Sequence, residues 1–364
     1  LTFLGKANGF TATDRISFQA INDSTQITWQ ADLEFTGLLQ YFIPIMRNSL
    51  LKLGKESMAG LAQALADNYS PPSSQAYSIK HQLVLPALWP FTKYGYLQAQ
   101  KTWNPVSAYI KNTHIVITGT SSGLGLASAY ALAAKGCQLT LIMRDAKKAH
   151  TIQDALIQHT GNLNIQVELA DLSIMAEVIA LSQRLKQQNK TIDVLINNAG
   201  ALFNPRQQTQ EGLEQSFALL LLSPFILTEQ LKPLLAKNAR VINVLSGGMY
   251  SQKIDVQDLE NKRGRYSGSV AYAKAKRGLM MMTEHWAKTW QTEGICVHAM
   301  HPGWAETTGV INALPEFYRL TKNFLRSPEQ GADTIVWLAS ASEAAKCTGL
   351  FWLDRKPQST HLLA

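Results

Sequence analysis

The sequence predicts an α/β protein: a doubly wound parallel sheet with helices on both faces, preceded by a partial α+β segment. From residue 111 onward, short aliphatic runs alternate with helical stretches, which is typical of a parallel sheet covered by helices. The first of these runs ends in a glycine-rich turn where a helix begins. Near the N-terminus, two runs of alternating apolar and polar residues precede a stretch of helical periodicity, as in an α+β unit.

The composition is that of a folded chain with more than one part. A length of 364 residues suggests two domains, or one large domain with an extension, at roughly 100 to 200 residues per domain. Apolar residues make up 46% of the chain and charged residues 16%, which excludes a disordered chain. The net charge of +8 is spread without any block of cations, so we expect no nucleic-acid partner.

The cysteines and the apolar runs bear on the compartment. Three widely spaced cysteines favour a reducing compartment, without a disulfide framework or a metal site. The longest apolar run, residues 217–222, is shorter than the roughly 20 residues that a membrane span needs. The cysteines thus lead us to expect a cytoplasmic protein. No secretory signal is visible, but a first residue of Leu leaves an N-terminal truncation open, so this absence shows little.

The predicted α+β segment covers residues 1–67. Its two alternating runs, 16–20 and 27–35, predict an antiparallel pair of strands joined by the turn-forming Asn22-Asp23. Apolar residues at helical spacing then predict a long amphipathic helix that reaches the end of the segment.

Residues 68–110 have the character of a linker between the two parts. Prolines interrupt this stretch repeatedly, and no periodicity runs through it. Its aromatic residues indicate that it packs against another part of the protein. We therefore expect the α/β domain over residues 111–364.

Six short apolar runs predict the strands of the α/β domain. The stretches between them have helical character, so the strands are expected to be parallel. The predicted strands are residues 114–118, 138–143, 165–170, 194–196, 241–245 and 296–300.

The glycine-rich turn predicts a dinucleotide site. It reads Thr118-Gly119-Thr120-Ser121-Ser122-Gly123-Leu124-Gly125. Glycines at a strand-to-helix junction let the backbone turn sharply and approach a pyrophosphate, which the amides at the helix start then hold.

The residue that ends the second strand bears on the choice of cofactor. An acidic residue at this place binds the ribose 2′-hydroxyl of NAD, whereas an Arg accommodates the 2′-phosphate of NADP. Arg144 stands there and favours NADP(H). Two alternatives stay open: Arg144 is only a surface residue at a helix start, or the adjacent Asp145 is the functional residue.

These motifs, taken in order, resemble the short-chain dehydrogenase/reductase superfamily. The glycine-rich turn is followed by Asp171-Leu172-Ser173, by Asn197-Asn198-Ala199-Gly200, by Ser246, and by Tyr272 with Lys276. The resemblance covers residues 111 to about 350 and implies a Rossmann fold. The segments that begin at Ser246, His301 and Asp354 are similar to one branch, the group of dehydrogenase/reductase family member 12.

Ser246, Tyr272 and Lys276 are the predicted catalytic residues. Hydride transfer to a carbonyl leaves an alkoxide that must be protonated, and a phenol does this poorly at neutral pH unless a cation lowers its pKa. Lys276 lies four residues after Tyr272, on the same helix face, and would supply that cation and bind the nicotinamide ribose. Ser246 would hydrogen-bond the substrate oxygen. A second Tyr–Lys pair, Tyr318 and Lys322, falls in what resembles the substrate loop and is expected to pack.

The resemblance also implies a set of cofactor contacts. Asp171 would contact the adenine ring, Thr307 would bind the nicotinamide carboxamide, and the Asn-Asn-Ala-Gly turn would mainly brace the sheet. His301 is expected to be structural. The implied contacts are Gly119, Ser121, Ser122, Gly123, Leu124, Gly125, Arg144, Asp171, Leu172, Asn198, Ala199, Gly200, Tyr272, Lys276, Pro302, Gly303 and Thr307.

One position departs from the family pattern. Many members carry a catalytic Asn in the helix before the Ser246 strand, and Leu220 falls at that place. Leu cannot form hydrogen bonds, so a proton path from Lys276 through this side chain is in doubt. Either the chain is a working enzyme that relays the proton otherwise, or it is a catalytically weak NADP(H)-binding sensor or lipid-binding module. The intact trio favours the enzyme.

Two further expectations concern the substrate and the assembly. Residues 1–67 resemble the C-terminal half of a polyketide-cyclase/START-like (SRPBCC) lipid-binding domain of the helix-grip type; an ordinary strand–helix extension is the alternative. With the apolar residues of the loop 304–324, this predicts a small apolar or lipid-like carbonyl or alcohol substrate. Many family members pair through the two helices that flank the active site, so a homo-oligomer is expected.

Overall fold

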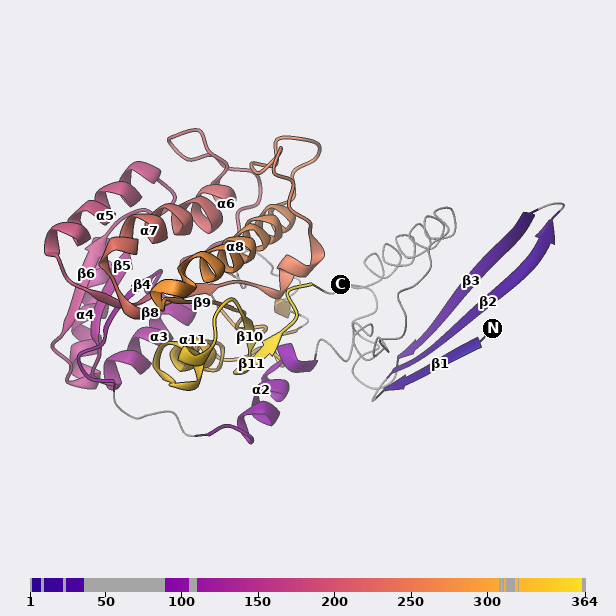
Figure 1. Cartoon of the computed structure of the whole chain (residues 1–364), viewed down its shortest axis with the longest axis horizontal. Helices are drawn as coiled ribbons and strands as arrows, with labels where there is room; N and C mark the ends of the chain where they lie inside the picture. Colours follow the sequence, from indigo (N-terminus) through magenta and orange to yellow (C-terminus); the bar gives the residue numbers. More distant parts are fainter. Residues whose placement is uncertain are drawn as a thin grey trace. The chain divides into compact units, whose positions relative to one another are not determined.

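The computed structural model divides into two compact units, Leu1–Trp89 and Pro90–Ala364, and each is described by itself (Figure 1). The structure describes residues 2–7, 10–21, 24–35, 89–104, 110–307, 309, 311, 318–319 and 321–361.

The first unit contains a three-stranded antiparallel sheet in the order β1-β2-β3. Its strands are β1 (Thr2–Ala7), β2 (Phe10–Ile21) and β3 (Ser24–Phe35). β2 and β3 pair with Ile16 opposite Trp29, so the two alternating runs do form an antiparallel pair. β1 was not predicted, because its short sequence contains Gly and lacks a clear alternation. The predicted helix up to residue 67 lies outside the described residues.

The second unit is built on an eight-stranded sheet in the order β11-β10-β9-β8-β7-β4-β5-β6. All neighbouring strands are parallel except β10 and β11. This arrangement confirms the predicted Rossmann fold. The strands are β4 (His114–Thr118), β5 (Gln138–Met143), β6 (Ile165–Leu169), β7 (Ile192–Asn197), β8 (Leu235–Val244), β9 (Cys296–Met300), β10 (Phe351–Leu353) and β11 (Lys356–Gln358).

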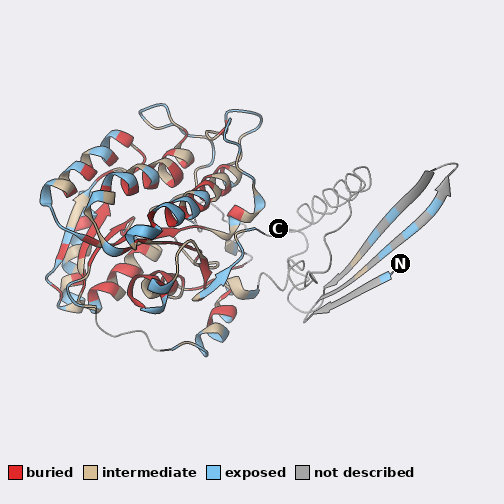
Figure 2. Cartoon of the chain, in the orientation of Figure 1, coloured by how far each residue is buried: buried red, intermediate tan, exposed pale blue. Residues whose placement is uncertain are grey.

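Helices cover both faces of this sheet, and their buried sides form two apolar cores (Figures 1 and 2). One core contains residues of α5 (Met175–Gln188), α7 (Ser223–Leu231) and α8 (Gly268–Trp290). The other contains residues of α3 (Gly123–Ala134), α4 (Ala146–Thr160) and α11 (Pro328–Ser340).

Residues 90–104, called here the leading segment, lie in the second unit. They contain the last two residues of η3 (Trp89–Phe91) and all of α2 (Lys93–Gln100). Tyr96 is buried, and its ring packs edge-on against Trp103 with centroids 5.2 Å apart. The structural division therefore falls earlier than the predicted domain start at residue 111, because the aromatic residues of this segment pack onto the α/β unit.

One helical stretch, Gln215–Leu234, is long and apolar enough to cross a membrane by length and composition. It comprises α6 (Gln215–Phe217), the π-helical turn η4 (Ala218–Leu222), α7 and η5 (Lys232–Leu234). Its residues Leu220, Leu227 and Leu231 are buried in the core between sheet and helices. A core helix of a Rossmann unit passes the same test, so we assign this stretch to the fold.

The topology brings several strand ends together. β4 is the switch point, because the chain fills the sheet on one side of it with β5 and β6 and on the other with β7 to β10. Ligands of such sheets bind outside the carboxyl ends of the strands at this point. A ligand site is therefore expected among the residues that follow β4, β5, β7, β8 and β9.

Candidate active site

The glycine-rich turn after β4 packs directly against the Asn197–Gly200 turn after β7. Gly119 has a φ of +72°, and a Cβ there would lie 2.6 Å from Ala199 Cα. Asn198 Nδ2 donates to the carbonyl oxygens of Thr118 and Gly119, at 2.8 and 3.1 Å. Asn198 thus has the bracing role expected of it, and only a residue without a side chain fits at position 119.

The start of α3 offers backbone amides to an anion. Ser122 is the N-cap residue, and its side chain makes no capping hydrogen bond. Ser121 and Ser122 are exposed, and Gly123 begins the helix. First-turn amides that no side chain caps can hold a pyrophosphate, with the helix dipole favouring its charge. These residues fit a dinucleotide.

Arg144 and Asp171 meet beyond the ends of β5 and β6. Their charged groups are 3.8 Å apart, and the Arg144 side chain is 73% exposed, so this ion pair is weak. Asp171 Oδ1 accepts hydrogen bonds from the amide and hydroxyl of Ser173. An exposed guanidinium at the end of β5 has room to bind an anion. Leu172, the residue after Asp171, is buried in the apolar core.

The turn after β9 closes the site on the side of the glycine-rich turn. A Cβ on Gly123 would lie 3.3 Å from Thr307 Cγ2, so Thr307 lies directly beside the start of α3. The Gly303 amide donates to His301 Nδ1 over 2.9 Å. Burial and, to a smaller extent, the Arg326 cation lower the pKa of His301 to about 3, so the ring is neutral. The buried Nε2 of His301 has no hydrogen-bond partner among the described residues, so the structural role expected of this histidine stays a prediction.

Ser246, Tyr272 and Lys276 lie together where β8 ends and α8 begins. Ser246 follows β8 as the N-cap of η6 (Gly247–Ser251) and forms a side-chain hydrogen bond with Tyr272. Tyr272 and Lys276 share one face of the first turns of α8, with Lys276 Nζ 5.9 Å from the Tyr272 ring centroid. Lys276 is 3% exposed and donates to the Val244 carbonyl over 2.7 Å.

The electrostatics of this trio differ from the expectation in one respect. Burial raises the pKa of Tyr272, and the hydrogen bond with Ser246 lowers it by less. The expected lowering of this pKa by the lysine is therefore wrong for the present arrangement, because Lys276 Nζ is turned to the Val244 carbonyl. Burial also lowers the pKa of Lys276 to about 8, so the lysine keeps its charge at neutral pH only by a small margin.

Leu220 lies next to Lys276, at the place where the family pattern has Asn. Leu220 is fully buried in the π-helical turn η4, and both residues line a cavity of about 10 Å³. The space is about the minimum for one water molecule. A Cβ on Gly200 would be 3.2 Å from Leu220 Cδ2 and 3.8 Å from Lys276 Nζ. The leucine thus fills this region with an apolar side chain.

The second Tyr–Lys pair lies elsewhere. Tyr318 donates to Glu306 Oε1 over 2.8 Å, a contact within its own loop. This hydrogen bond is the main reason that the pKa of Tyr318 is raised. Much of the predicted substrate loop lies outside the described residues.

Comparison with known proteins agrees with this geometry. The family profile described as short chain dehydrogenase matches residues 113–316. The protein belongs to the short-chain dehydrogenase/reductase superfamily. Its oxidoreductase family and Rossmann fold are therefore established, whereas the matched profile does not reach the N-terminal segment. The predicted START-like character of residues 1–67 has no support from this match and stays a prediction.

Two known proteins of this superfamily are similar in sequence to this chain. It is 41% identical over 277 residues to human dehydrogenase/reductase SDR family member 12, covering 75% of this chain and 86% of the relative. It is 32% identical to mouse retinol dehydrogenase 12, covering 66% and 78%. The relation to the branch expected from the sequence is thus confirmed.

Solved structures share the fold of the second unit. L-sorbose reductase from Gluconobacter frateurii, complexed with NADPH and L-sorbose, matches with a TM-score of 0.55 and 23% identity, over 67% of this chain and 95% of that one. Angucycline C-6 ketoreductase LanV with bound NADP gives the same four values. At this identity the likeness concerns the fold alone.

Proposed function

We propose that this short-chain dehydrogenase is an NADP(H)-dependent oxidoreductase that interconverts a carbonyl and an alcohol on a small apolar or lipid-like substrate. The observation that carries the proposal is the meeting of Ser246, Tyr272 and Lys276 at the carboxyl edge of the sheet, beside the turn that holds Thr307. When bound, the dinucleotide supplies or accepts the hydride.

The protein's own residues would orient the substrate and move the proton. In reduction, the Ser246 hydroxyl donates a hydrogen bond to the substrate oxygen, and the Tyr272 hydroxyl gives its proton to the alkoxide as it forms. A raised pKa keeps Tyr272 protonated before the reaction, which suits a general acid. The Lys276 ammonium then stabilises the phenolate that is left.

Arg144 supports NADP(H) over NAD(H). Its exposed guanidinium stands at the end of β5, where a ribose 2′-phosphate lies in folds of this type. Asp145 caps α4, accepting a hydrogen bond from the Lys148 amide over 3.1 Å, and this contact competes with a role in binding ribose.

Replacement of Tyr272 by Phe tests the proposal. The ring is retained but the proton donor is lost, so we expect turnover to fall by about 100-fold or more while NADPH binding stays within about twofold. Turnover is followed by NADPH absorbance with apolar ketones and aldehydes, and binding by fluorescence titration. Tyr318→Phe is the matched control, because it removes the hydroxyl of the other Tyr–Lys pair. Equal turnover of Tyr272→Phe and the parent would overturn the assignment.

A second candidate function is a cofactor-binding module with little catalysis. The observation that favours it is Leu220, which places an apolar side chain beside Lys276.

Two further proposals, on the compartment and on the assembly, hold for both candidate functions. The free state of Cys137, Cys296 and Cys347 supports the cytoplasm as the compartment. The exposed Phe225 of α7 and Met281 of α8 support pairing of two copies through these helices.

A further inference from the structure

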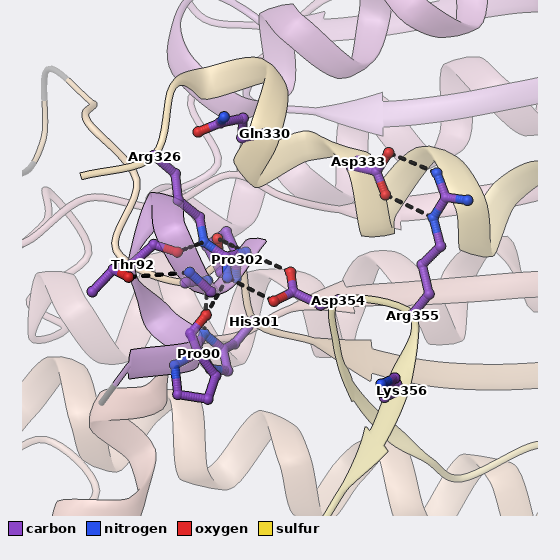
Figure 3. A network of polar contacts seen from close by, with 12 residues as sticks. Pro90, Thr92, His301, Pro302, Arg326, Gln330, Asp333, Asp354, Arg355 and Lys356 are labelled. Atoms are coloured by element: carbon purple, nitrogen blue, oxygen red, sulfur yellow. Dashed lines mark hydrogen bonds and ion pairs between the residues drawn. The ribbon is translucent and has the colours of Figure 1, made fainter. Parts of the chain in front are cut away.

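A buried ion pair lies behind the turn that follows β9. Arg326 and Asp354 have side chains that are 1% and 6% exposed, and they are joined by two parallel hydrogen bonds of 2.7 and 2.8 Å (Figure 3). The resemblance assigned neither residue a role. Burial of two charges is costly unless every donor is satisfied, so the remaining contacts of the guanidinium decide what the pair does.

Those contacts join two segments that are far apart in the sequence. Arg326 Nη1 donates to the Pro302 carbonyl over 3.2 Å, and Nε donates to the Thr92 carbonyl over 3.3 Å. Nη2 donates to the Pro90 carbonyl (Figure 3). One guanidinium therefore binds three backbone oxygens. One lies in the turn after β9 (residues 302–304), called here the cofactor turn because the resemblance implies that it contacts the cofactor, and two lie in the leading segment.

Backbone hydrogen bonds complete the same junction. The Trp304 amide donates to the Phe91 carbonyl over 2.7 Å, and the Arg326 amide donates to the Trp304 carbonyl over 2.8 Å. The Phe91 ring packs edge-on against His301, with centroids 4.6 Å apart. A Cβ on Gly247, the residue after Ser246, would lie 3.8 Å from Phe91 Cζ. The leading segment thus reaches the edge of the catalytic trio.

The backbone at Gly303 packs tightly against Arg326 and Phe91. Gly303 has a φ of +74°, and a Cβ there would lie 2.4 Å from Arg326 Nε and 2.7 Å from the Phe91 carbonyl oxygen. The position of the guanidinium therefore determines where residues 302–304 can lie. Thr307, four residues further on, lies beside the glycine-rich turn.

We propose that Arg326, held by Asp354, is a positioning residue that ties the cofactor turn to the leading segment, so that residues 90–92 are a built-in part of the active site. The proposal rests on the proposed function for its effect on NADPH. Its structural content, the placement of residues 302–307, can be tested without any ligand.

A second Arg–Asp pair supplies a matched control. Arg355 donates to both carboxylate oxygens of Asp333, at 2.8 and 2.7 Å, and its guanidinium lies 4.0 Å from the Trp103 ring centroid. Arg355 also donates to the Asn104 carbonyl at the far end of the leading segment, and within the described part of the chain its hydrogen bonds do not reach the Pro302–Gly303 turn (Figure 3). It therefore controls for loss of a similar bidentate ion pair, although its side chains are 13% and 19% exposed and so less buried.

The experiment compares Arg326→Lys with Arg355→Lys in the full chain. Lysine keeps the charge but cannot form the fork that reaches Asp354 and three carbonyls at once. We expect Arg326→Lys to raise the Kd and KM for NADPH and to lower kcat/KM roughly 10- to 100-fold, as misplaced binding groups do. Arg355→Lys should stay within about twofold of the parent, and the pH profile of kcat should stay unchanged in both.

Amide hydrogen exchange without NADPH separates the two proposals. Peptides that span residues 302–307 should exchange about tenfold faster in Arg326→Lys and at the parent rate in Arg355→Lys. If the parent binds no NADPH, the proposed function fails, and the exchange comparison still decides the positioning role. A folded Arg326→Lys with parental exchange in this turn overturns the inference. Should that variant not fold, Asp354→Asn is measured instead, with the same sign of effect expected and the same result overturning it.

Discussion

At the scale of the residue, Arg144 has the most direct consequence for cofactor choice. Its guanidinium is exposed and makes only a 3.8 Å ion pair with Asp171. A charge-assisted hydrogen bond contributes about 1.5 to 3 kcal/mol when a phosphate is its acceptor. A hydrogen bond from Arg144 to a 2′-phosphate would therefore stabilise the bound cofactor by more than the loss of the weak ion pair with Asp171 would cost.

We predict that Arg144→Ala weakens NADPH binding by roughly 10- to 100-fold and leaves NADH binding within about twofold. The measurement is a fluorescence titration with each dinucleotide at fixed ionic strength. Arg265→Ala, which removes another exposed arginine, controls for loss of net charge. A parallel loss of both cofactors, or an unchanged preference, would contradict the role of Arg144.

At the scale of the element, the π-helical turn η4 determines what stands beside Lys276. The turn places Leu220 against the lysine in a cavity of about 10 Å³, where a water molecule scarcely fits. π-Helical turns are frequent at functional sites. Here the turn places the apolar side chain of Leu220 beside the Lys276 ammonium, which takes part in the proposed proton transfer.

We predict that Leu220→Asn lowers the free energy of unfolding by about 2 to 4 kcal/mol, because it replaces a fully buried apolar side chain with a polar one. Since we propose a working enzyme, we expect the parent to turn over and the variant to gain less than about tenfold in kcat. Leu220→Ala, which only enlarges the cavity, separates an effect of water from one of the amide. An inactive parent that gains about 100-fold in Leu220→Asn supports the binding-module alternative instead.

The elements also differ in how far the sequence predicts them. β4, β5 and β9 begin and end where their aliphatic runs do, because these strands are buried and bounded by turn or glycine residues. α11 was not predicted, although Ser327 and Gln330 form a capping box at its start, a signal that the sequence does contain. The ion pair of Arg326 and Asp354 carries no such signal, since its partners meet only in the folded chain.

At the scale of the whole molecule, buried histidines link stability to pH. Burial lowers the pKa of His114, His298 and His301, the last to about 3 from 6.5. His301 therefore stays neutral in the folded state while it takes up a proton in the unfolded chain below about pH 6.5, and the pKa values of His114 and His298 are shifted in the same direction. The unfolded state binds more protons there, so stability falls as the pH is lowered from 6.5 toward 3.

We predict that lowering the pH from 7.5 to 5 removes about 2 kcal/mol of stability through His301 alone. Denaturant unfolding of the parent and of His301→Asn at both pH values measures it, since Asn retains an acceptor for the Gly303 amide. The variant should lose less stability on acidification than the parent. His150→Asn, at an exposed position, should lose as much as the parent. Equal losses in the parent and in His301→Asn would show that this histidine does not contribute.

Because the leading segment packs onto the α/β unit, the start of the compact unit and the start of the family match are different residues. The family profile begins at residue 113, whereas the compact unit begins at Pro90. A chain cut at the family boundary would lose the carbonyls of Pro90 and Thr92 and leave a buried guanidinium with unmet donors. We therefore expect a piece cut at residue 113 to be less stable than one that begins at Pro90.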